Sequence, residues 1–434
     1  HQELDAVYTL YQKTRAPEYL DKARYLFNRS KSLILEEKIR QSQTVAHLTE
    51  TEKRTLRDWQ VKLRQAYQHQ LDTLIRQDSL SRVIFTLKNA INAFLAAKEG
   101  QWKKESIGGS YLEYAIFEDE VMAYFQLDEI KGWTTLGPKM DLDRLIAALN
   151  AYLSSPMMDN DKVLTDLYKY LITPITGYLP DQITVIPDGV IGLIPFDILK
   201  DHTGQMLIRH HTIHYAHAYT LLSDTTHQAE RSNTICLMAP IYSDGSAIAS
   251  NSRGSLYPLK YNRMEIDSIS RLYGQHARTL KIENDQTLLD SIAAAGIFHF
   301  AGHAVINGDG AFLALSAEDR PDQRLTLEEL STLKRGPDLV VLSACETGLG
   351  KLAVGEGIRS LGRSFAEAGT KASVISLWNV DDRSTSRIMV SFYKYLLAGN
   401  PVAEALRKAK LEYISVSEDG MDHPYFWAGF VCPE

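Results

Sequence analysis

The fold follows from two short stretches, Gly296-Ile-Phe-His-Phe-Ala-Gly-His303 and Asp338-Leu-Val-Val-Leu-Ser-Ala-Cys345-Glu-Thr-Gly348. Each is an apolar run rich in aliphatic, aromatic or β-branched residues, which is typical of a buried parallel strand. Each run ends near a side chain that can do chemistry, and small or turn-forming residues follow. In an open α/β sheet the carboxyl ends of adjacent parallel strands face one crevice. We therefore expect His303 and Cys345 to lie together at one edge of a sheet.

A thiol beside an imidazole is the arrangement of an activated nucleophile. The base raises the thiolate fraction at neutral pH, and the thiolate is the reactive form. The small neighbours Gly302 and Ala304 would let a substrate backbone approach the His303 ring. The alternative for Cys345 is a buried structural cysteine, because free cysteines are often core residues. We predict that Cys345 is a nucleophile, that His303 is its base and that His299 is a core residue.

These segments resemble the CHAT peptidases, a caspase-like branch related to separase. The resemblance rests on Ser343-Ala-Cys345-Glu-Thr-Gly348 and on the upstream Phe300-Ala-Gly-His303. Caspases proper carry a Q-A-C-[RQG]-G elbow with the histidine about 50 residues upstream. Here Ser343 replaces the glutamine, which departs from caspases and agrees with the CHAT pattern. Three further pieces stand in the family's order and extend the resemblance over residues 105–434: Ile186-Pro-Asp-Gly-Val-Ile-Gly-Leu-Ile-Pro195-Phe196, Ser376-Leu-Trp-Asn-Val-Asp-Asp382 and His423-Pro-Tyr-Phe-Trp-Ala-Gly429.

The resemblance implies a cysteine endopeptidase that works through a His–Cys dyad. By analogy with caspases, the backbone N–H groups of Cys345 and Ala304 would stabilise the oxyanion that forms on the attacked carbonyl. No third residue that orients His303 can be assigned, and caspase-like enzymes generally use a dyad alone. We expect no cofactor and no metal ion at this site.

Acidic residues near the dyad are the candidates for substrate binding. Asp381 and Asp382 follow an expected strand at 372–378 and so stand at the same sheet edge, and Glu346 follows the nucleophile. In clostripain-like and separase-like relatives an acidic residue in this region receives a basic P1 side chain, and a carboxylate suits Arg or Lys. The alternatives are that Asp381 or Asp382 caps the next helix and that Glu346 is solvated. The sequence leans towards a basic P1 residue and leaves these alternatives open.

Glycine and proline divide the chain into parts. All 26 glycines lie at or after Gly100, and no proline occurs between Pro17 and Pro138. Because these residues are the strongest breakers of regular structure, residues 1–104 are predicted to be an all-helical segment. It looks similar to the end of a tetratricopeptide array. Residues 105–230 are predicted to form a small α/β unit, which the resemblance identifies as a catalytically inactive pseudo-caspase half.

Strands and helices alternate through residues 231–434. This alternation predicts a mostly parallel sheet with helices on both faces. The predicted fold class is therefore α/β and caspase-like, with the active peptidase domain at 231–434. Strands are expected at 234–239, 277–282, 297–301, 339–344, 372–378 and 426–431, and helices near 262–273, 286–295, 326–333, 355–368 and 384–398.

Composition excludes several classes of protein. The net charge of −7 argues against nucleic acid as a direct partner, because phosphate binding needs a basic face. No apolar run approaches the length of a membrane span. Three cysteines without a CxxC pattern fit a reducing compartment, so we expect a cytoplasmic protein. The chain starts at His1 rather than Met, which leads us to expect a piece of a longer protein.

Four histidines crowd one short segment: His210, His211, His214 and His217. No carboxylate or cysteine joins them at metal-ligand spacing, so structural or surface roles are favoured over a metal site.

We therefore predict a CHAT endopeptidase that cleaves a partner protein in bacterial signalling or defence, under the control of an attached or associated sensor domain or regulatory protein. The first alternative is a caspase-like scaffold with an unused dyad that serves protein–protein interaction. The second is a thiol hydrolase that acts on a small amide or ester.

Overall fold

The computed structural model describes two stretches in detail, residues 109–217 and residues 234–434. The gaps within them are 155, 157–160, 243–245, 248–254, 257, 281–284, 308–309, 316–323, 331–332, 334, 344–351, 354–356, 359–360, 379, 419 and 434. Before residue 109 it describes residues 2–14 and scattered positions: 16, 18–19, 22, 48–49, 51–52, 54–55, 58–59, 62, 86–87, 90 and 93–94. The chain divides into two compact units, one made of residues 1–34 and 107–434 and the other of residues 35–106.

In the second unit, the described positions carry helix signals. Thr49 and Glu52 form a capping box, in which the Thr49 N–H donates to Glu52 Oε2 at 2.9 Å and the Glu52 N–H donates to Thr49 Oγ1 at 3.4 Å. The rings of Trp59 and Phe94 meet edge to face with centroids 5.6 Å apart. Most of the region that looks similar to a tetratricopeptide lies outside the described residues.

The first unit contains a five-stranded sheet in the order β3-β2-β1-β4-β5. Its first three strands are an antiparallel meander, and β4 and β5 continue it parallel to β1. The bounds of the strands are β1 (Tyr111–Ile116), β2 (Glu120–Leu127), β3 (Ile130–Pro138), β4 (Gln182–Ile186) and β5 (Thr212–Tyr215). The helices α6 (Lys139–Leu153) and α7 (Lys162–Leu171) pack against this sheet and bury their leucines in the core. Three short 3-10 helices lie between β4 and β5: η1 (Gly189–Leu193), η2 (Phe196–Ile198) and η3 (Leu207–Arg209).

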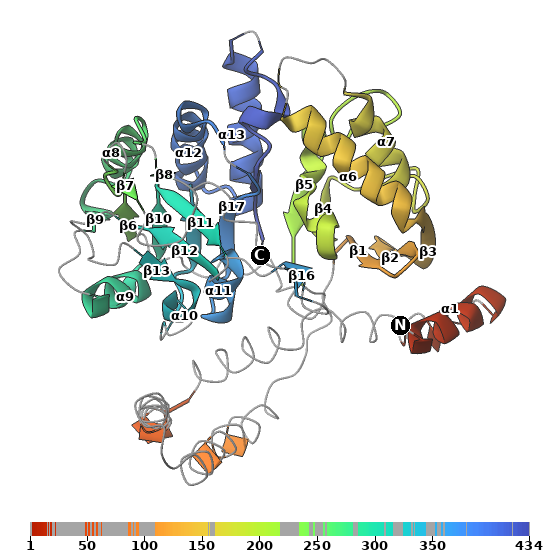
Figure 1. Cartoon of the computed structure of the whole chain (residues 1–434), viewed down its shortest axis with the longest axis horizontal. Helices are drawn as coiled ribbons and strands as arrows, with labels where there is room; N and C mark the ends of the chain where they lie inside the picture. Colours follow the sequence, from red (N-terminus) through yellow and green to blue (C-terminus); the bar gives the residue numbers. More distant parts are fainter. Residues whose placement is uncertain are drawn as a thin grey trace. The chain divides into compact units, whose positions relative to one another are not determined.

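A six-stranded sheet follows in the order β18-β17-β14-β10-β6-β9. All its neighbouring strands are parallel except β18, which runs antiparallel to β17. The three central strands are buried at every position, as expected for a sheet covered on both faces. The strands are β6 (Ile235–Met238), β9 (Ala277–Thr279), β10 (Ile297–Phe300), β14 (Leu339–Leu342), β17 (Ala372–Ser376) and β18 (Phe430–Val431). The helices are α8 (Asn262–Tyr273), α9 (Asp285–Ala294), α10 (Leu327–Leu330), α11 (Leu361–Glu367), α12 (Asp382–Leu397) and α13 (Val402–Val416). The expected α/β fold class is confirmed (Figure 1).

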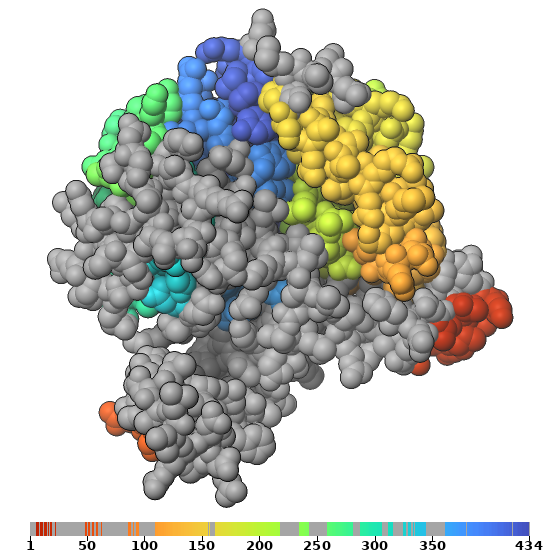
Figure 2. Space-filling view, viewed as in Figure 1, coloured from red at the N-terminus to blue at the C-terminus, as the bar shows by residue number. Residues whose placement is uncertain are grey.

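The two sheets meet at their edges. Tyr215 at the end of β5 forms a bridge with Pro433, and its N–H donates to the Cys432 carbonyl at 3.2 Å. On one face of the molecule α12 and α13 (blue) fill the space between α8 (green) and the helices α6 and α7 (yellow) (Figure 2). The first half of the unit, residues 109–217, contains the five-stranded sheet, and the second half, residues 234–434, contains the six-stranded sheet. The helix α13 therefore lies where it can contact both halves.

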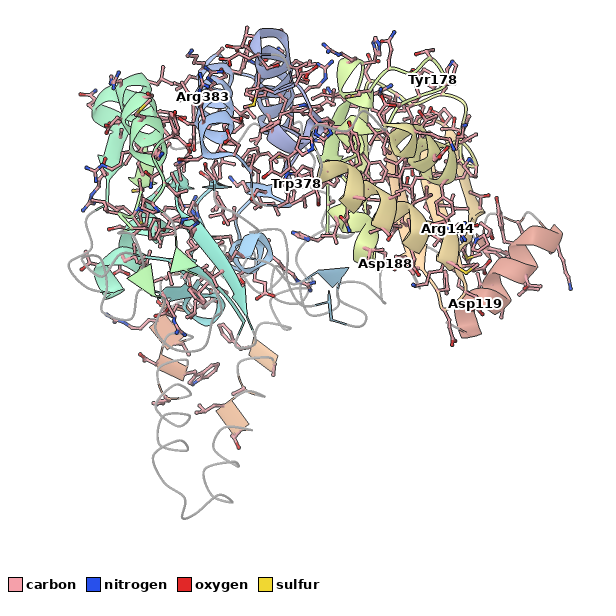
Figure 3. All side chains as sticks on the ribbon, turned by 45° about the horizontal axis from the view of Figure 1, so that its top comes forward. Asp119, Arg144, Tyr178, Asp188, Trp378 and Arg383 are labelled. Atoms are coloured by element: carbon pink, nitrogen blue, oxygen red, sulfur yellow. The ribbon has the colours of Figure 1, made fainter. Side chains whose placement is uncertain are left out.

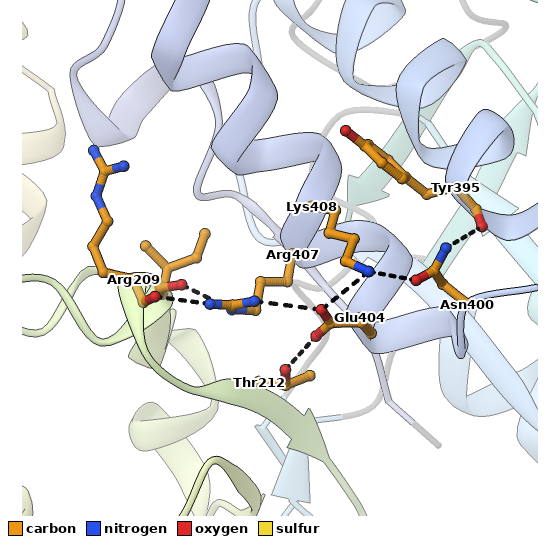
Figure 4. A network of polar contacts seen from close by, with 8 residues as sticks. Arg209, Thr212, Tyr395, Asn400, Glu404, Arg407 and Lys408 are labelled. Atoms are coloured by element: carbon orange, nitrogen blue, oxygen red, sulfur yellow. Dashed lines mark hydrogen bonds and ion pairs between the residues drawn. The ribbon is translucent and has the colours of Figure 1, made fainter. Parts of the chain in front are cut away.

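Side chains of α13 bind the first half directly (Figure 4). Arg407 donates to the carbonyl oxygens of Ile208 and Arg209, at 2.9 and 2.8 Å. Glu404 accepts a hydrogen bond from the Thr212 hydroxyl. Lys410 forms a buried ion pair with Asp197 of η2. Because the pairs are partly or fully buried, they join the two halves more firmly than surface contacts would.

Three expectations about elements need correction. The helix expected at 355–368 begins only at Leu361, and Gly357–Ile358 instead forms β16, paired with β15 (Leu352–Ala353). The strand expected at 426–431 is only β18, because Pro424–Phe426 forms the 3-10 helix η6 with Pro at its start. His303 follows β10 as expected, but the residues after it do not form a turn, because they begin a further strand, β11 (His303–Asn307).

Besides β15 and β16, other strands were not predicted. One is β3, whose polar and glycine-containing sequence hides the alternation of a strand; Gly132 in it lies under the Phe125 ring, which a Cβ would meet at 2.4 Å. The other is a small antiparallel sheet made of β11 (His303–Asn307), β12 (Gly310–Ala314) and β13 (Arg324–Thr326). This sheet stands directly after β10 and carries the candidate base.

Among the described residues, no helix combines the length and the apolar character that crossing a bilayer requires.

Candidate active site

The site begins where β10 and β14 end. These strands are parallel neighbours, with Ile297 opposite Leu339 and Phe300 opposite Leu342. The Ser343 N–H donates to the Phe300 carbonyl at 2.9 Å, which extends the pairing one residue beyond the strands. The chain therefore leaves both strands at the same edge, on the way to His303 from one and to Cys345 from the other.

His303 is held in place through its backbone. Its N–H donates to the Tyr242 hydroxyl at 3.0 Å, and that hydroxyl donates to the Ala314 carbonyl at 2.7 Å. The Tyr242 and His303 rings are tilted, with centroids 4.7 Å apart. Position 302 must be glycine, because a Cβ there would lie 2.6 Å from the Phe300 ring and 2.7 Å from the Tyr242 oxygen. The half-buried imidazole thus has a fixed place at the start of β11.

His303 borders a cavity of about 300 Å³. Polar residues of its wall come from several parts of the fold. They are His303 after β10, Ser343 after β14, Asp381 and Asp382 at the start of α12, Thr385 in α12, and Asn262 and Glu265 in α8. Its apolar part includes Leu259, Val380, Tyr425, Phe426 and Phe430. A cavity with apolar walls and a few convergent polar groups is the usual form of a ligand site.

The two aspartates hold helix ends while they line the cavity. Asp381 is the N-cap of α12, and its Oδ1 accepts from the Ser384 N–H and hydroxyl, each at 2.8 Å. Asp382 Oδ2 accepts from the backbone N–H groups of Lys260 and Tyr261, at 2.7 and 2.8 Å, just before α8 begins. The capping alternative is therefore confirmed for Asp381.

Burial raises the pKa of the Asp382 carboxyl above its ordinary value, and the nearby Asp381 adds to the rise. The hydrogen bonds from Tyr261 and Lys260 and the proximity of His303 oppose it. Asp382 is therefore a partly desolvated acid close enough to the imidazole for their charges to interact.

The floor of the cavity is a buried polar chain. His299 Nε2 lies 2.8 Å from Glu265 Oε1, and His299 Nδ1 lies 3.1 Å from the Tyr393 hydroxyl. Asn262 Nδ2 donates to the carbonyl oxygens of Pro240 and Ala301, at 3.1 and 3.3 Å. His299 is thus the core residue that the sequence predicted, and its partners fix α8 and α12 to β10.

A family model described as "CHAT domain" matches residues 161–433. The chain belongs to the CHAT domain family. The match starts just before α7 and ends after β18, so it includes part of the first sheet, the whole second sheet and the cavity.

Other proteins are similar to this chain over part of its length. Tetratricopeptide repeat protein 28 of Homo sapiens is 31% identical over 107 residues, which make up 25% of this chain and 4% of that protein. The separase–securin complex of Saccharomyces cerevisiae is similar over 63% of this chain and 17% of that chain, with 13% identity and a TM-score of 0.42. The complex of Porphyromonas gingivalis RgpB pro- and mature domains is similar over 68% of this chain and 75% of that chain, with 12% identity and a TM-score of 0.38. The chain thus spans a small part of the length of the first two.

Within the CHAT domain, three predicted site residues meet at one cavity: His303, Asp381 and Asp382. Ala304 follows His303 in β11, is buried and stands opposite Leu313 of β12. Cys345 and Glu346 lie outside the described residues, so their places relative to His303 stay predictions. Glu265, Asn262 and the side chain of Ser343 were not predicted as site residues.

The other CHAT motif pieces hold the fold together (Figure 3). The Asp188 carboxylate accepts from the Ile116 N–H of β1 at 2.7 Å. The Trp378 ring N–H donates to the Tyr425 carbonyl at 2.9 Å, and the buried Trp427 donates to the Asp422 carbonyl at 2.8 Å. These side chains of the motifs therefore hold backbone groups and do not line the cavity.

Two of the four clustered histidines have local partners instead of a common centre. His210 Nε2 lies 2.6 Å from Gln205 Oε1, and His211 Nδ1 lies 2.8 Å from the Pro180 carbonyl. In the part of the chain that the structure describes, no three His, Cys, Asp or Glu side chains gather as a metal site would require.

Proposed function

We propose that this CHAT domain is a cysteine endopeptidase in which Cys345 is the nucleophile and His303 is its base. One observation carries the proposal: Ser343 is bonded to Phe300 at the sheet edge and lines the same cavity as His303. Cys345 is only two positions after Ser343, and two residues span about 7 Å at most. A thiol that near to a cavity bordered by a fixed imidazole suits nucleophilic catalysis.

The reaction would proceed through an acyl-enzyme. His303 takes the Cys345 proton as the sulfur attacks the scissile carbonyl, and the backbone N–H groups of Cys345 and Ala304 stabilise the oxyanion. The tetrahedral intermediate collapses, the peptide C–N bond breaks, and His303 gives its proton to the leaving amine. Water then attacks the thioester, and the acid product and free thiol result.

The substrate is proposed to carry a basic P1 side chain. Asp381 and Asp382 line the cavity beside His303, and in each the hydrogen bonds from described residues go to one carboxylate oxygen. A cation in this cavity would form charge-assisted hydrogen bonds with them. Glu346 is proposed as a further acid near the same pocket.

The wider setting is also proposed. Residues 231–434 would form the active peptidase, residues 105–230 a pseudo-caspase half and residues 1–104 a helical segment that connects to a sensor. The substrate would be a partner protein in the bacterial cytoplasm, and a sensor domain or regulatory protein would gate its cleavage. The contacts of α13 with η2, η3 and β5 support this, because they give the first half a way to influence the second.

The alternative is a scaffold whose dyad is unused. If this alternative holds, Cys345 should be no more reactive than the free cysteines Cys236 and Cys432. Cys236 is the matched control, because its thiol is buried and burial raises its pKa above the ordinary value.

The test uses a P1-diverse fluorogenic peptide library and a peptidyl electrophile. Wild type and Cys236→Ala should cleave peptides with a basic P1 residue and should be labelled at Cys345, whereas Cys345→Ala and His303→Ala should lose at least 100-fold in kcat/KM. Cleavage that survives Cys345→Ala would contradict the proposal. Wild type that neither cleaves nor becomes labelled, with and without candidate activators, would support the scaffold.

A further inference from the structure

The Tyr242 hydroxyl bridges the two strands of the hairpin that carries His303. His303 stands opposite Ala314 in the antiparallel pairing of β11 with β12. The His303 N–H donates to the Tyr242 oxygen at 3.0 Å, and the Tyr242 hydroxyl donates to the Ala314 carbonyl at 2.7 Å. These opposite residues are therefore joined through the hydroxyl at the point where β11 begins.

Tyr242 is itself held firmly. It follows β6, is 5% exposed and packs in an apolar cluster with Phe312 and Ala314. Its ring centroid lies 4.7 Å from that of His303, with an angle of 56° between the ring planes. The tyrosine thus contacts His303 in two separate ways, because its hydroxyl bonds the backbone and its ring packs against the imidazole.

The hydroxyl matters for where His303 lies. Without it, the His303 N–H and the buried Ala314 carbonyl would both lose this partner, which costs free energy. Opposite residues of an antiparallel pair can bond each other directly when their strands are close. The loss therefore favours a movement of His303 towards β12. A displacement of about 1 Å at a catalytic site is enough to cost about 100-fold in rate.

We propose that Tyr242 is a positioning residue that sets the place of the His303 imidazole relative to Cys345. The inference rests on the proposed peptidase function and deepens it. The described residues that line the cavity do not include Tyr242, so it acts through His303 and not on the substrate.

The test is Tyr242→Phe, which keeps the ring and removes the hydroxyl. With the best peptide of the library, kcat should fall about 10- to 100-fold, whereas KM should change less than about threefold, because Tyr242 does not contact the substrate. Alkylation of Cys345 by iodoacetamide, followed by mass spectrometry at several pH values, reports on the thiol–imidazole pair without a peptide. The midpoint of this profile should move upward by about half a pH unit or more, because a displaced imidazole stabilises the thiolate less.

Two further variants separate positioning from a structural role. Tyr114→Phe removes another buried tyrosine hydroxyl, which donates to the Leu171 carbonyl at 3.2 Å in the first half. It should leave kcat and the alkylation midpoint unchanged, even where its melting temperature falls as much as that of Tyr242→Phe. Replacement of Tyr242 by para-aminophenylalanine returns a hydrogen-bonding group to the same place. Both readouts should then lie nearer to wild type than those of Tyr242→Phe, and this variant keeps the test open if Tyr242→Phe does not fold.

A kcat and an alkylation midpoint like those of wild type in Tyr242→Phe would overturn the inference and leave the peptidase intact. A lower kcat with an unchanged midpoint would also overturn it, because the thiol–imidazole pair would then be undisturbed. If wild type cleaves no peptide and Cys345 is not labelled by the peptidyl electrophile, the peptidase proposal fails and this inference fails with it.

Discussion

His217 is a histidine whose surroundings keep it neutral. Its Nε2 is buried, and the described residues offer it no hydrogen-bond partner. Burial lowers the pKa of His217 to about 4, and the positive charge of Arg363 contributes to this. In the unfolded chain a histidine titrates near 6.5. Between these two values the unfolded chain binds the proton more readily, so acid favours unfolding.

We expect the free energy of unfolding to fall as the pH drops from about 6.5 to about 4, and to be constant for this group above that range. The loss should be about 1–2 kcal/mol, less than the full shift implies, because the residue as a whole is only half-buried. His217→Gln cannot be protonated and should flatten this part of the profile, measured by urea unfolding at several pH values. His202→Gln, at an exposed position, is the control and should leave the slope unchanged. Burial also lowers the pKa of His423, so part of the slope should remain, but a slope as steep in His217→Gln as in wild type would contradict the assignment.

At the scale of elements, the N-terminus of α12 links the cavity to the helix pair. Asp381 accepts from Ser384, and the Ser384 hydroxyl lies 2.8 Å from the Tyr413 hydroxyl of α13. The cap therefore serves two purposes, because it satisfies the first turn of the helix and it holds one cavity carboxylate in a fixed direction.

Asp381→Ala should lower the free energy of unfolding by about 1 kcal/mol, because the orphan N–H of Ser384 loses its acceptor. Asp381→Asn should cost less, since an asparagine oxygen also caps. Denaturant titration of both variants checks this order. If Asp381→Ala were as stable as wild type, the carboxylate would not be acting as a cap in solution.

The elements were predictable where their periodicity was strong. The runs around 297–301 and 339–344 and the amphipathic pattern of 262–273 correspond to β10, β14 and α8. The strand β3 was missed because its sequence is polar and contains glycine, and the strands β11, β12 and β13 were missed because they are short and do not alternate clearly. Pairing with neighbouring strands supplies the order in both cases.

The residues of the candidate site likewise divide into those that the sequence predicted and those that it did not. His303, Asp381 and Asp382 follow strands, so the rule about carboxyl edges placed them together. Glu265 could not be found in this way, because it belongs to a helix whose pattern indicates only which face is buried. The side chain of Ser343 reaches the cavity wall because of what surrounds it in space, and no spacing along the chain reveals that.

At the scale of the whole CHAT domain, α13 joins two sheets that share one edge. Lys410 of this helix and Asp197 form a buried ion pair, with side chains 1% and 9% exposed. Three positions further along the same helix, Tyr413 contacts Ser384, which bonds the cavity aspartate. A single helix thus touches the first half on one side and the support of the cavity on the other.

This geometry makes the ion pair a test of whether the halves depend on each other. Lys410→Met should lower the free energy of unfolding by about 3–5 kcal/mol, because it leaves Asp197 buried without its cation. The double variant Lys410→Met with Asp197→Leu should recover most of that loss, since an apolar pair of similar size avoids the cost of burying charge. Urea unfolding of both single variants and the double variant gives the coupling energy.

The control is the exposed pair of Arg383 and Glu418, whose charged atoms are 3.5 Å apart. Arg383→Met should change stability by less than about 1 kcal/mol, because solvent screens exposed pairs. If Lys410→Met were as mild as this control, the interface between the halves would be open to water in solution. The first half could then not act on the cavity through α13, and a regulator would have to reach the cavity by another route.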